Sequence, residues 1–293
     1  MTCRFGILTV LALPVAAQTL SGVVDLHAHC SPDIVPRSID ALSLVRLAKD
    51  RGFRAIVLKN HYEPTAGLAW LTRRQTAGIE VFGGIALNRA VGGVNPAAVE
   101  RMTKVDGGFG RVVWMPTFDA EHHIKTGGEK RPFVSVSRNS KLLPEVIEVL
   151  DIIGKNKLVL ATGHSSGPES LLMIEEAHRR GVEKIIVTHP TNSRVLMTPD
   201  LMQRAVSLGA YLEFTANSIH GTIKESEPAA MAAAIRKVGI ERAILSSDFG
   251  QAGNPTHADG LEIVFSLLRK EGLSVGDIDR IAKTNPARLL GLE

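Results

Sequence analysis

Half of the ten histidines in this chain stand at the ends of short apolar runs, and an aspartate ends the last of these runs. The positions are His27, His29, His61, His164, His189 and Asp248. Imidazole and carboxylate groups are the ligands that suit Zn²⁺, Fe²⁺ or Mn²⁺. Alternate residues of an extended chain point to the same side, so His27 and His29 can bind one ion together. The set therefore predicts a metal site.

Eight short apolar runs, rich in β-branched residues, alternate with amphipathic segments along the chain. The runs occupy residues 23–26, 55–59, 80–87, 111–115, 158–162, 184–188, 210–214 and 242–246. Continuous apolar runs are typical of parallel strands that are covered on both faces. Prolines at the starts and glycines at the ends of the intervening segments predict helices there. Eight such units in about 250 residues predict an α/β fold, specifically a (β/α)8 TIM-type barrel.

A barrel of parallel strands brings the carboxyl ends of all its strands to one face, and barrel active sites lie at that face. The histidines and the aspartate at the ends of the runs should therefore meet there. Residues 116–142, after the fourth run, are polar and longer than an ordinary connection. We expect them to form a long loop over the same face, as a lid or substrate loop, with His122 and His123 exposed to solvent.

The order of these residues resembles the amidohydrolase superfamily. The superfamily pattern is His-x-His after strand one, a histidine after strand five, a histidine after strand six and an aspartate after strand eight. The corresponding residues here are His27, His29, His164, His189 and Asp248. The closing segment, residues 284–292, is also similar to the last helix of the superfamily, and the resemblance extends over residues 21–292. Lys59-x-His61 at the end of the second run marks an uncharacterised branch.

The resemblance implies a metal-dependent hydrolase. The five matching residues would hold a divalent ion, zinc first, with iron or manganese as alternatives. A metal-activated water would attack an amide, lactone or ester of a small substrate, with an anionic group on that substrate as one option. Asp248 would accept the proton of the water and pass it to the leaving group, and His189 would bind the ion or polarise the scissile group. The candidate substrate-binding residues are Lys59, His61, Arg37 and Asn192.

The number of ions is left open between one and two. Two-metal members of the superfamily carry a carboxylated lysine or a glutamate after strand four. Here the fourth run ends Trp114-Met-Pro-Thr117, and no lysine or acid follows before Asp119. We therefore expect one ion. Lys59, at the end of the second run, is the alternative bridge between two ions, or else it binds substrate.

The N-terminal segment has the three-part pattern of a secretory signal peptide. Arg4 precedes a short apolar run that ends in small residues at Ala17. The run is shorter than the ~20 apolar residues that span a bilayer. We expect residues 1–17 to be removed and residues 18–293 to form a single amidohydrolase-like barrel domain. The mature protein would be secreted or periplasmic, without membrane contact after cleavage.

The composition limits the partners of the protein. Its formal charge of +4 is scattered along the chain, and aromatic residues make up only 4%. A nucleic-acid surface needs clustered Lys and Arg with stacking aromatics, so we expect no nucleic acid. The expected partner is a small-molecule substrate, and a homo-oligomer is left open. Cys30 would be the lone thiol of the mature chain, without a disulfide partner.

Two alternatives remain. Phosphoesterases of the polymerase-and-histidinol-phosphatase type also open with His-x-His, but they tend to finish with Asp-x-His, whereas the last run here continues as Asp248-Phe-Gly-Gln251. A phosphate-release screen separates the two. An exported barrel that binds a metal or ligand without turnover is the second alternative. An acid at position 248 favours catalysis, because a storage site needs no proton acceptor.

Overall fold

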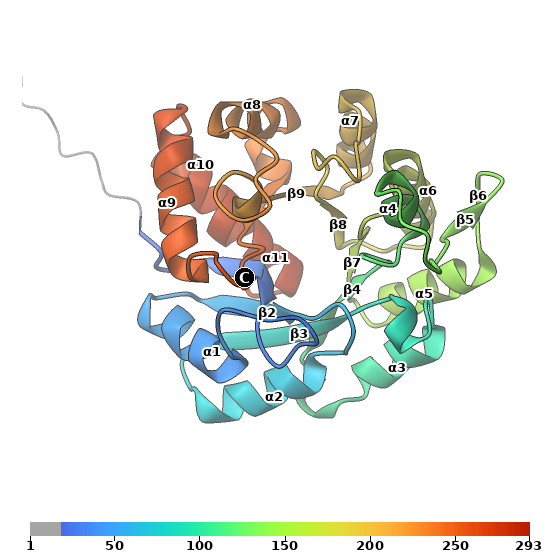
Figure 1. Cartoon of the computed structure of the whole chain (residues 1–293), viewed down its shortest axis with the longest axis horizontal. Helices are drawn as coiled ribbons and strands as arrows, with labels where there is room; N and C mark the ends of the chain where they lie inside the picture. The colour runs from blue at the N-terminus through green and yellow to red at the C-terminus, as the bar shows by residue number, and fades with distance from the viewer. Residues whose placement is uncertain (1–18) are drawn as a thin grey trace, which may run out of the picture.

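An eight-stranded parallel sheet forms the centre of the molecule in a computed structural model that describes residues 19–293 (Figure 1). The predicted leader at residues 1–17 lies outside the described residues. Neighbouring strands of the sheet follow one another along the chain. In spatial order they are β1 (Val24–His29), β2 (Ala55–Lys59), β3 (Glu80–Ala86), β4 (Gly110–Trp114), β7 (Val159–Ala161), β8 (Ile185–Thr188), β9 (Tyr211–Thr215) and β10 (Ala243–Ser246).

The sheet closes on itself between its first and last strands. The backbone N–H of Asp248 donates to the carbonyl of His27 at 2.8 Å, and that of His29 donates to the carbonyl of Phe249 at 2.9 Å. Both bonds lie just beyond the carboxyl end of β10. The predicted (β/α)8 barrel is thereby confirmed.

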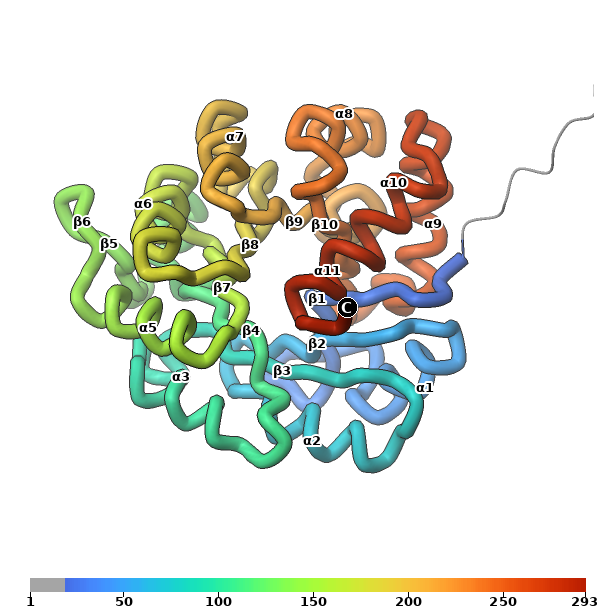
Figure 2. Tube along the Cα trace, turned by 180° about the vertical axis from the view of Figure 1, so that it is seen from behind, coloured from blue at the N-terminus to red at the C-terminus, as the bar shows by residue number. Residues whose placement is uncertain are grey.

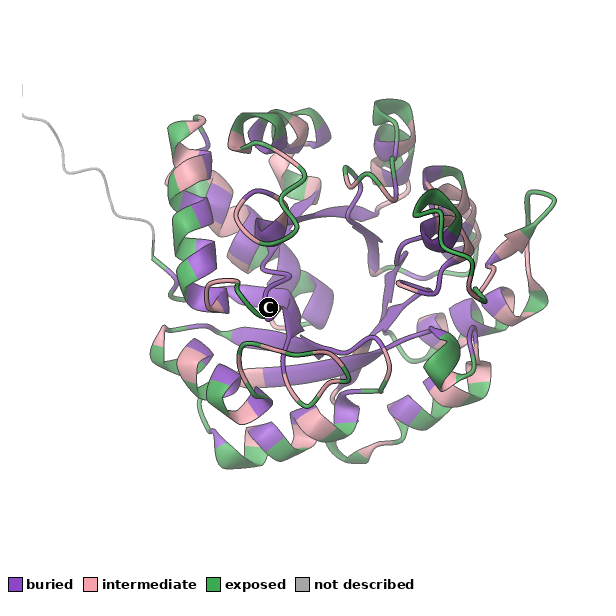
Figure 3. Cartoon of the chain, in the orientation of Figure 1, coloured by how far each residue is buried: buried purple, intermediate pink, exposed green. Residues whose placement is uncertain are grey.

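A helix follows each strand on the outside of the barrel, with one face buried and the other exposed (Figure 3). Four of these helices begin at a proline, as predicted, because the first helical turn tolerates a missing N–H. The helices are α1 (Ala41–Asp50), α2 (Ala66–Gln75), α3 (Pro96–Thr103), α5 (Pro144–Lys155), α6 (Gly167–Arg179), α7 (Pro199–Ser207), α8 (Pro228–Val238) and α9 (His257–Lys270). Among residues 19–293, no helix is both long and apolar enough to cross a bilayer.

The sheet separates two apolar cores. One core fills the space between the strands and the surrounding helices. The other fills the barrel interior, where Val24, Trp114 and Ile244 pack together. After α10 (Val275–Asp279), helix α11 (Asn285–Leu290) packs Leu290 against this interior core and lies against β1 at the back of the barrel (Figure 2). The amino-terminal end is therefore filled by apolar side chains, and the opposite end is left for polar chemistry.

An irregularity in β1 turns two histidines toward that opposite end. The register of β1 against β2 shifts between Asp25 and Ala28. Leu26 packs in the barrel interior and Ala28 packs in the outer core. In a strictly alternating strand, His27 would then face outward. The extra residue of a bulge re-aims His27, and Asp25 holds the bulge by accepting the N–H of His27 at 3.2 Å and that of Ser247 at 2.9 Å.

The segment after β4 is only partly irregular. It contains α4 (Glu121–Thr126) and a short hairpin of β5 (Ser137–Arg138) and β6 (Lys141–Leu142). The prediction of a long connection after the fourth strand is confirmed, and the structure adds this helix and hairpin within it. Its role as a lid stays a prediction.

Gly250 tests how closely the chain packs at the barrel seam, where the first and last strands of the sheet meet. Its φ is +118°, and a Cβ there would lie 2.0 Å from the carbonyl oxygen of His29. Gly250→Ala should lower the free energy of unfolding by about 3 kcal/mol or more, because backbone strain adds to overpacking. Urea denaturation measures this loss.

Gly239 provides a matched control, because its φ is +95° and no atom lies within 4 Å of an added Cβ. Gly239→Ala should cost only the strain, about 1–2 kcal/mol. Equal losses in the two variants would contradict the close approach at the seam.

Candidate metal centre

The carboxyl ends of the strands open into a cavity of about 480 Å³. All nine residues that the sequence predicts as site residues line this cavity. They come from five of the eight strand ends or from the loops that follow them. The structure therefore brings the predicted set together at one place.

Asp248 is the centre of this set. Its Oδ1 lies 3.1 Å from Nε2 of His27 and 3.2 Å from Nε2 of His29. Its Oδ2 lies 3.8 Å from Nε2 of His189. One donor atom each from His27, His189 and Asp248 lies within 4.8 Å of the others, as ligands of one ion would. These side chains converge from β1, the end of β8 and the end of β10.

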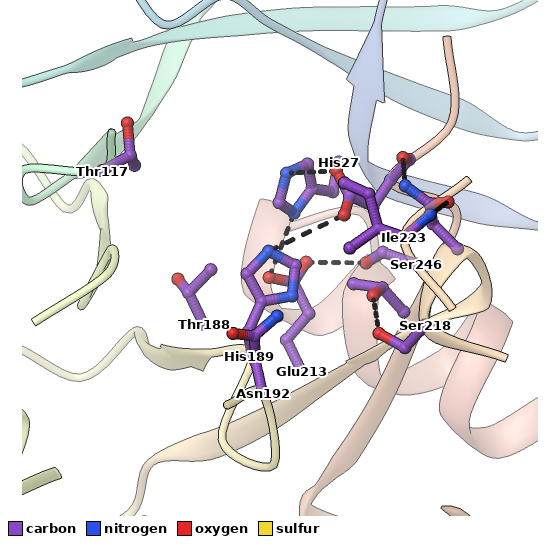
Figure 4. A network of polar contacts seen from close by, with 12 residues as sticks. His27, Thr117, Thr188, His189, Asn192, Glu213, Ser218, Ile223 and Ser246 are labelled. Atoms are coloured by element: carbon purple, nitrogen blue, oxygen red, sulfur yellow. Dashed lines mark hydrogen bonds and ion pairs between the residues drawn. The ribbon is translucent and has the colours of Figure 1, made fainter. Parts of the chain in front are cut away.

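The histidines of β1 are oriented from behind by oxygen atoms. Nδ1 of His27 lies 3.3 Å from Oε2 of Glu213, and Oε1 of Glu213 accepts the hydroxyl of Ser246 at 2.8 Å (Figure 4). Nδ1 of His29 lies 3.1 Å from the backbone carbonyl of Lys59. Metal-binding histidines usually donate the second ring N–H to such an oxygen, which leaves the other nitrogen free for the ion. His27 and His29 thus fit a metal at Nε2.

Glu213 was missed in the sequence. It lies in β9 within an otherwise apolar run, and its side chain is almost fully buried. Because Tyr211 packs in the barrel interior, the alternation of a strand places Glu213 inside as well. A charged residue at an interior position of a buried strand is the signal that could have found it.

The electrostatics of the site favour a cation. Burial alone would raise the pKa of Asp248, but the surrounding His27, His29 and His189 hold it well below its ordinary value. Burial and Lys59 lower the pKa of His27, yet the carboxylates of Asp248 and Glu213 outweigh them and raise it. Burial lowers the pKa of His189 to about 4. The carboxylate is therefore ionised at neutral pH, and His189 offers a lone pair.

Two residues of the centre have left-handed backbone conformations. The φ of His189 is +50° and that of Asp248 is +54°. Such a conformation costs on the order of 1 kcal/mol or more for a residue with a Cβ, and it persists only where the surrounding structure holds it. The strained residues are the two that leave β8 and β10 to face the cavity.

Lys59 lies inside the centre rather than on the protein surface. Its Nζ is 2.8 Å from Nε2 of His27 and 5.2 Å from the ring centre of Trp114. Burial lowers its pKa to about 8. The predicted roles of Lys59, as a bridge between ions or as a substrate-binding residue, both require this inward position and both stay predictions.

His61 is held between two rings. It stacks on His29 with the ring centroids 4.8 Å apart and on Phe118 with the centroids 4.0 Å apart. Its Nδ1 contacts the hydroxyl of Thr117 at 2.8 Å, and Asn88 also donates to that hydroxyl at 2.6 Å. His61 therefore supports the position of His29 besides lining the cavity.

Loops supply the outer wall of the cavity. Arg37 pairs with Asp33, with both Nε and Nη2 at 2.7 Å from Oδ2 of that residue, and its side chain is buried. Asn192 accepts the N–H of Arg194 at 2.8 Å. The two arginines present positive charge toward the space beside the metal ligands. Arg194 was missed in the sequence because it lies within a loop and no pattern marks it.

His123 differs from its prediction. It was expected to be exposed to solvent, but only 7% of it is exposed. Its ring stacks on His164 with the centroids 4.9 Å apart, and the two Nδ1 atoms are 3.0 Å apart. Because α4 packs back over the cavity, His123 is brought against the end of β7. The neighbouring His122 is only partly exposed.

The fold and the site together define a (β/α)8 barrel with a histidine–aspartate centre at the carboxyl ends of its strands. The chain belongs to the family of unknown function DUF6282, whose model matches residues 22–213. No curated protein matches the chain by sequence.

Several solved structures share the fold. An amidohydrolase from Pseudomonas aeruginosa aligns with a TM-score of 0.66 at 12% identity, over 92% of this chain and 95% of that one. A phosphotriesterase homology protein from Escherichia coli, complexed with phosphate in its active site, aligns at 0.62 and 19%, over 92% and 98%. A mutant PTE-like lactonase from Deinococcus radiodurans aligns at 0.62 and 14%, over 94% and 97%. These likenesses confirm the fold that the resemblance to the amidohydrolase superfamily implied.

Replacing Glu213 should weaken metal binding while leaving the barrel folded. Glu213→Gln removes the negative charge behind His27, and such changes typically cost about 10- to 100-fold in metal affinity. Competition with a chromophoric chelator measures this affinity. Glu100→Gln, on the exposed side of α3, is the matched control and should bind like the parent protein. Equal affinities for all three proteins would contradict the orienting role of Glu213.

Lys59 should make the stability of the metal-free protein depend on pH. Its pKa is about 8 in the folded chain against an ordinary value of 10.5. Between these values the unfolded chain binds the extra proton, so the free energy of unfolding should rise with pH, by up to roughly 3 kcal/mol. This contribution is complete above pH 10.5 and is lost as the pH falls through 8. Urea denaturation in the presence of a chelator, compared with Lys59→Met, isolates it. Parallel pH profiles for the two proteins would contradict the burial of a titrating lysine.

Proposed function

We propose that this protein is a divalent-metal-dependent hydrolase that acts on a small substrate. The observation that carries the proposal is the contact of one carboxylate, Asp248, with the Nε2 atoms of His27 and His29 at 3.1 and 3.2 Å, with His189 close by. Three imidazole nitrogens and one carboxylate form a ligand set that suits zinc, with iron or manganese as alternatives.

A bound divalent ion would lower the pKa of a water molecule and polarise the bond to be cut. The other tasks belong to the protein. Oδ1 of Asp248 faces His27 and His29, whereas Oδ2 is 3.8 Å from His189 and less engaged. Because Asp248 is ionised at neutral pH, Oδ2 is positioned to accept a proton and return it to a leaving group. The barrel wall of buried strands excludes bulk water from one side.

The substrate class that we propose is a lactone, ester or amide with an anionic group. Arg37, Lys59 and Arg194 line the cavity, and among the described residues of its lining only Glu225 adds a carboxylate besides Asp248. A cavity of about 480 Å³ is within the range of sites for small molecules. The fold neighbour described as a PTE-like lactonase supports a lactone or ester as the substrate. We further propose, from the leader segment alone, that the protein works outside the cytoplasm.

Metal content and turnover are the direct test. The purified chain should contain zinc, iron or manganese, measured by mass spectrometry, and the double variant His27→Ala/His29→Ala should lose it. Metal-dependent hydrolysis should then appear within a panel of lactones, carboxylic esters, amides and phosphate esters. Absence of metal in both proteins after reconstitution would refute the proposal, and metal without any turnover would favour the binding barrel.

Replacing Asp248 should separate binding from turnover. Asp248→Asn keeps an oxygen ligand but removes the proton acceptor, so turnover should fall by about 10²- to 10⁴-fold while metal remains bound. Steady-state rates and metal content on the same sample measure both effects. Asp259→Asn, on the exposed face of α9, is the control and should keep full activity. Unchanged turnover in Asp248→Asn would rule out its role as the base.

A further inference from the structure

His123 reaches His164 from the loop after β4, and its hydrogen bonds have a fixed direction. Nη1 of Arg194 lies 3.0 Å from Nε2 of His123, and the two Nδ1 atoms of His123 and His164 lie 3.0 Å apart. A guanidinium has only donors and does not lose its proton in a protein. Nε2 of His123 must therefore be the acceptor, so the hydrogen of this ring is on Nδ1.

The direction continues into His164. Since Nδ1 of His123 carries the hydrogen, it donates, and Nδ1 of His164 accepts with its lone pair. A neutral ring that accepts at Nδ1 carries its own hydrogen on Nε2. In this arrangement neither nitrogen of His164 has a lone pair left for an ion.

The histidines of β1 differ from His164, because their Nδ1 atoms face hydrogen-bond acceptors rather than a donor. Nδ1 of His27 faces a carboxylate oxygen of Glu213, and Nδ1 of His29 faces the carbonyl of Lys59. Those acceptors hold the hydrogen on Nδ1 and leave Nε2 for an ion. Lys59 contacts Nε2 of His27 at 2.8 Å, so an ion at that nitrogen would take the place of one ammonium group. At His164 the competing group is the ring of His123, which is buried and whose other nitrogen contacts Arg194.

We propose that the centre binds a single ion, on His27, His29, His189 and Asp248, and that His164 is a hydrogen-bond donor to substrate rather than a metal ligand. The Arg194–His123 pair fixes His164 in this role by occupying its Nδ1. In two-metal members of the superfamily, a residue after strand four bridges the ions. Here the segment after β4 instead supplies His123, whose Nδ1–H donates to His164. Nε2–H of His164 remains as a donor in the cavity that His164 lines. The inference rests on the proposed metal-dependent function.

Metal stoichiometry tests the inference without reference to activity. The purified chain is incubated with excess zinc and with bicarbonate, so that carboxylation of a lysine is not limiting, and loosely held metal is removed. The wild-type chain should keep about one equivalent of zinc, which is the content of a mononuclear site. His164→Phe preserves the stacked ring and should keep the same single equivalent. His189→Ala removes a proposed ligand from the same wall and should weaken zinc binding by at least the roughly 10-fold that loss of a supporting group costs.

The outcomes separate the two proposals. Two equivalents in the wild-type chain, or loss of the ion in His164→Phe, would overturn the single-ion inference and leave the metal hydrolase standing. No bound metal in the wild-type chain would overturn both. A second measurement needs no variant, namely imidazole ¹⁵N NMR of the zinc-loaded chain. His164 should show a hydrogen on Nε2 and a lone pair on Nδ1, and a zinc-bound nitrogen at His164 would overturn the inference even if a variant fails to fold.

Discussion

The contact of Asp248 with His27 and His29 at the barrel seam is the constraint on which the centre depends. β10 brings the carboxylate and β1 brings the imidazoles, and the two segments lie at opposite ends of the chain. Two backbone hydrogen bonds on either side of this contact close the barrel. These side chains therefore meet only when the barrel is closed, so assembly of the centre depends on the fold. The filled interior below, with α11 at the far end, leaves the carboxyl end as the polar one.

Most of the centre could be predicted from the sequence because of one topological rule. The carboxyl ends of parallel strands meet at one face, so the fold alone predicts where the residue that follows each apolar run will lie. Histidines 27, 29, 164 and 189 and Asp248 obeyed this rule, and they line one cavity. The eight apolar runs also corresponded to the eight strands of the barrel. Both predictions rest on local pattern and on a connectivity that each βα unit imposes.

Other features depended on contacts between distant parts of the chain. The bulge in β1 places both Leu26 and His27 inside, which no alternating pattern indicates. His123 lies in a polar segment, and only Arg194, 71 residues later, fixes how its ring is turned. The inward position of Glu213 could have been predicted, because Tyr211 sets the inward positions of β9. It was missed because a single acid in an apolar run does not indicate which residue it contacts.

The side chains of the site come from two kinds of position, strand ends and connections, and the two groups have different roles. The proposed ligands and Glu213 lie on strands or one to two residues beyond a strand end, where backbone hydrogen bonds hold them even in left-handed conformations such as those of His189 and Asp248. Arg37, His123 and Arg194 lie on connections outside the barrel. Strands shared by the whole barrel can change little without loss of the fold, whereas connections tolerate change. The proposed chemistry of bond cleavage would therefore be tied to the barrel, whereas two of the three positive charges that line the cavity, Arg37 and Arg194, come from connections. The chain of contacts from Arg194 through His123 to His164 is the point where the two meet, because there a loop residue determines which nitrogen a strand-end histidine presents to the cavity.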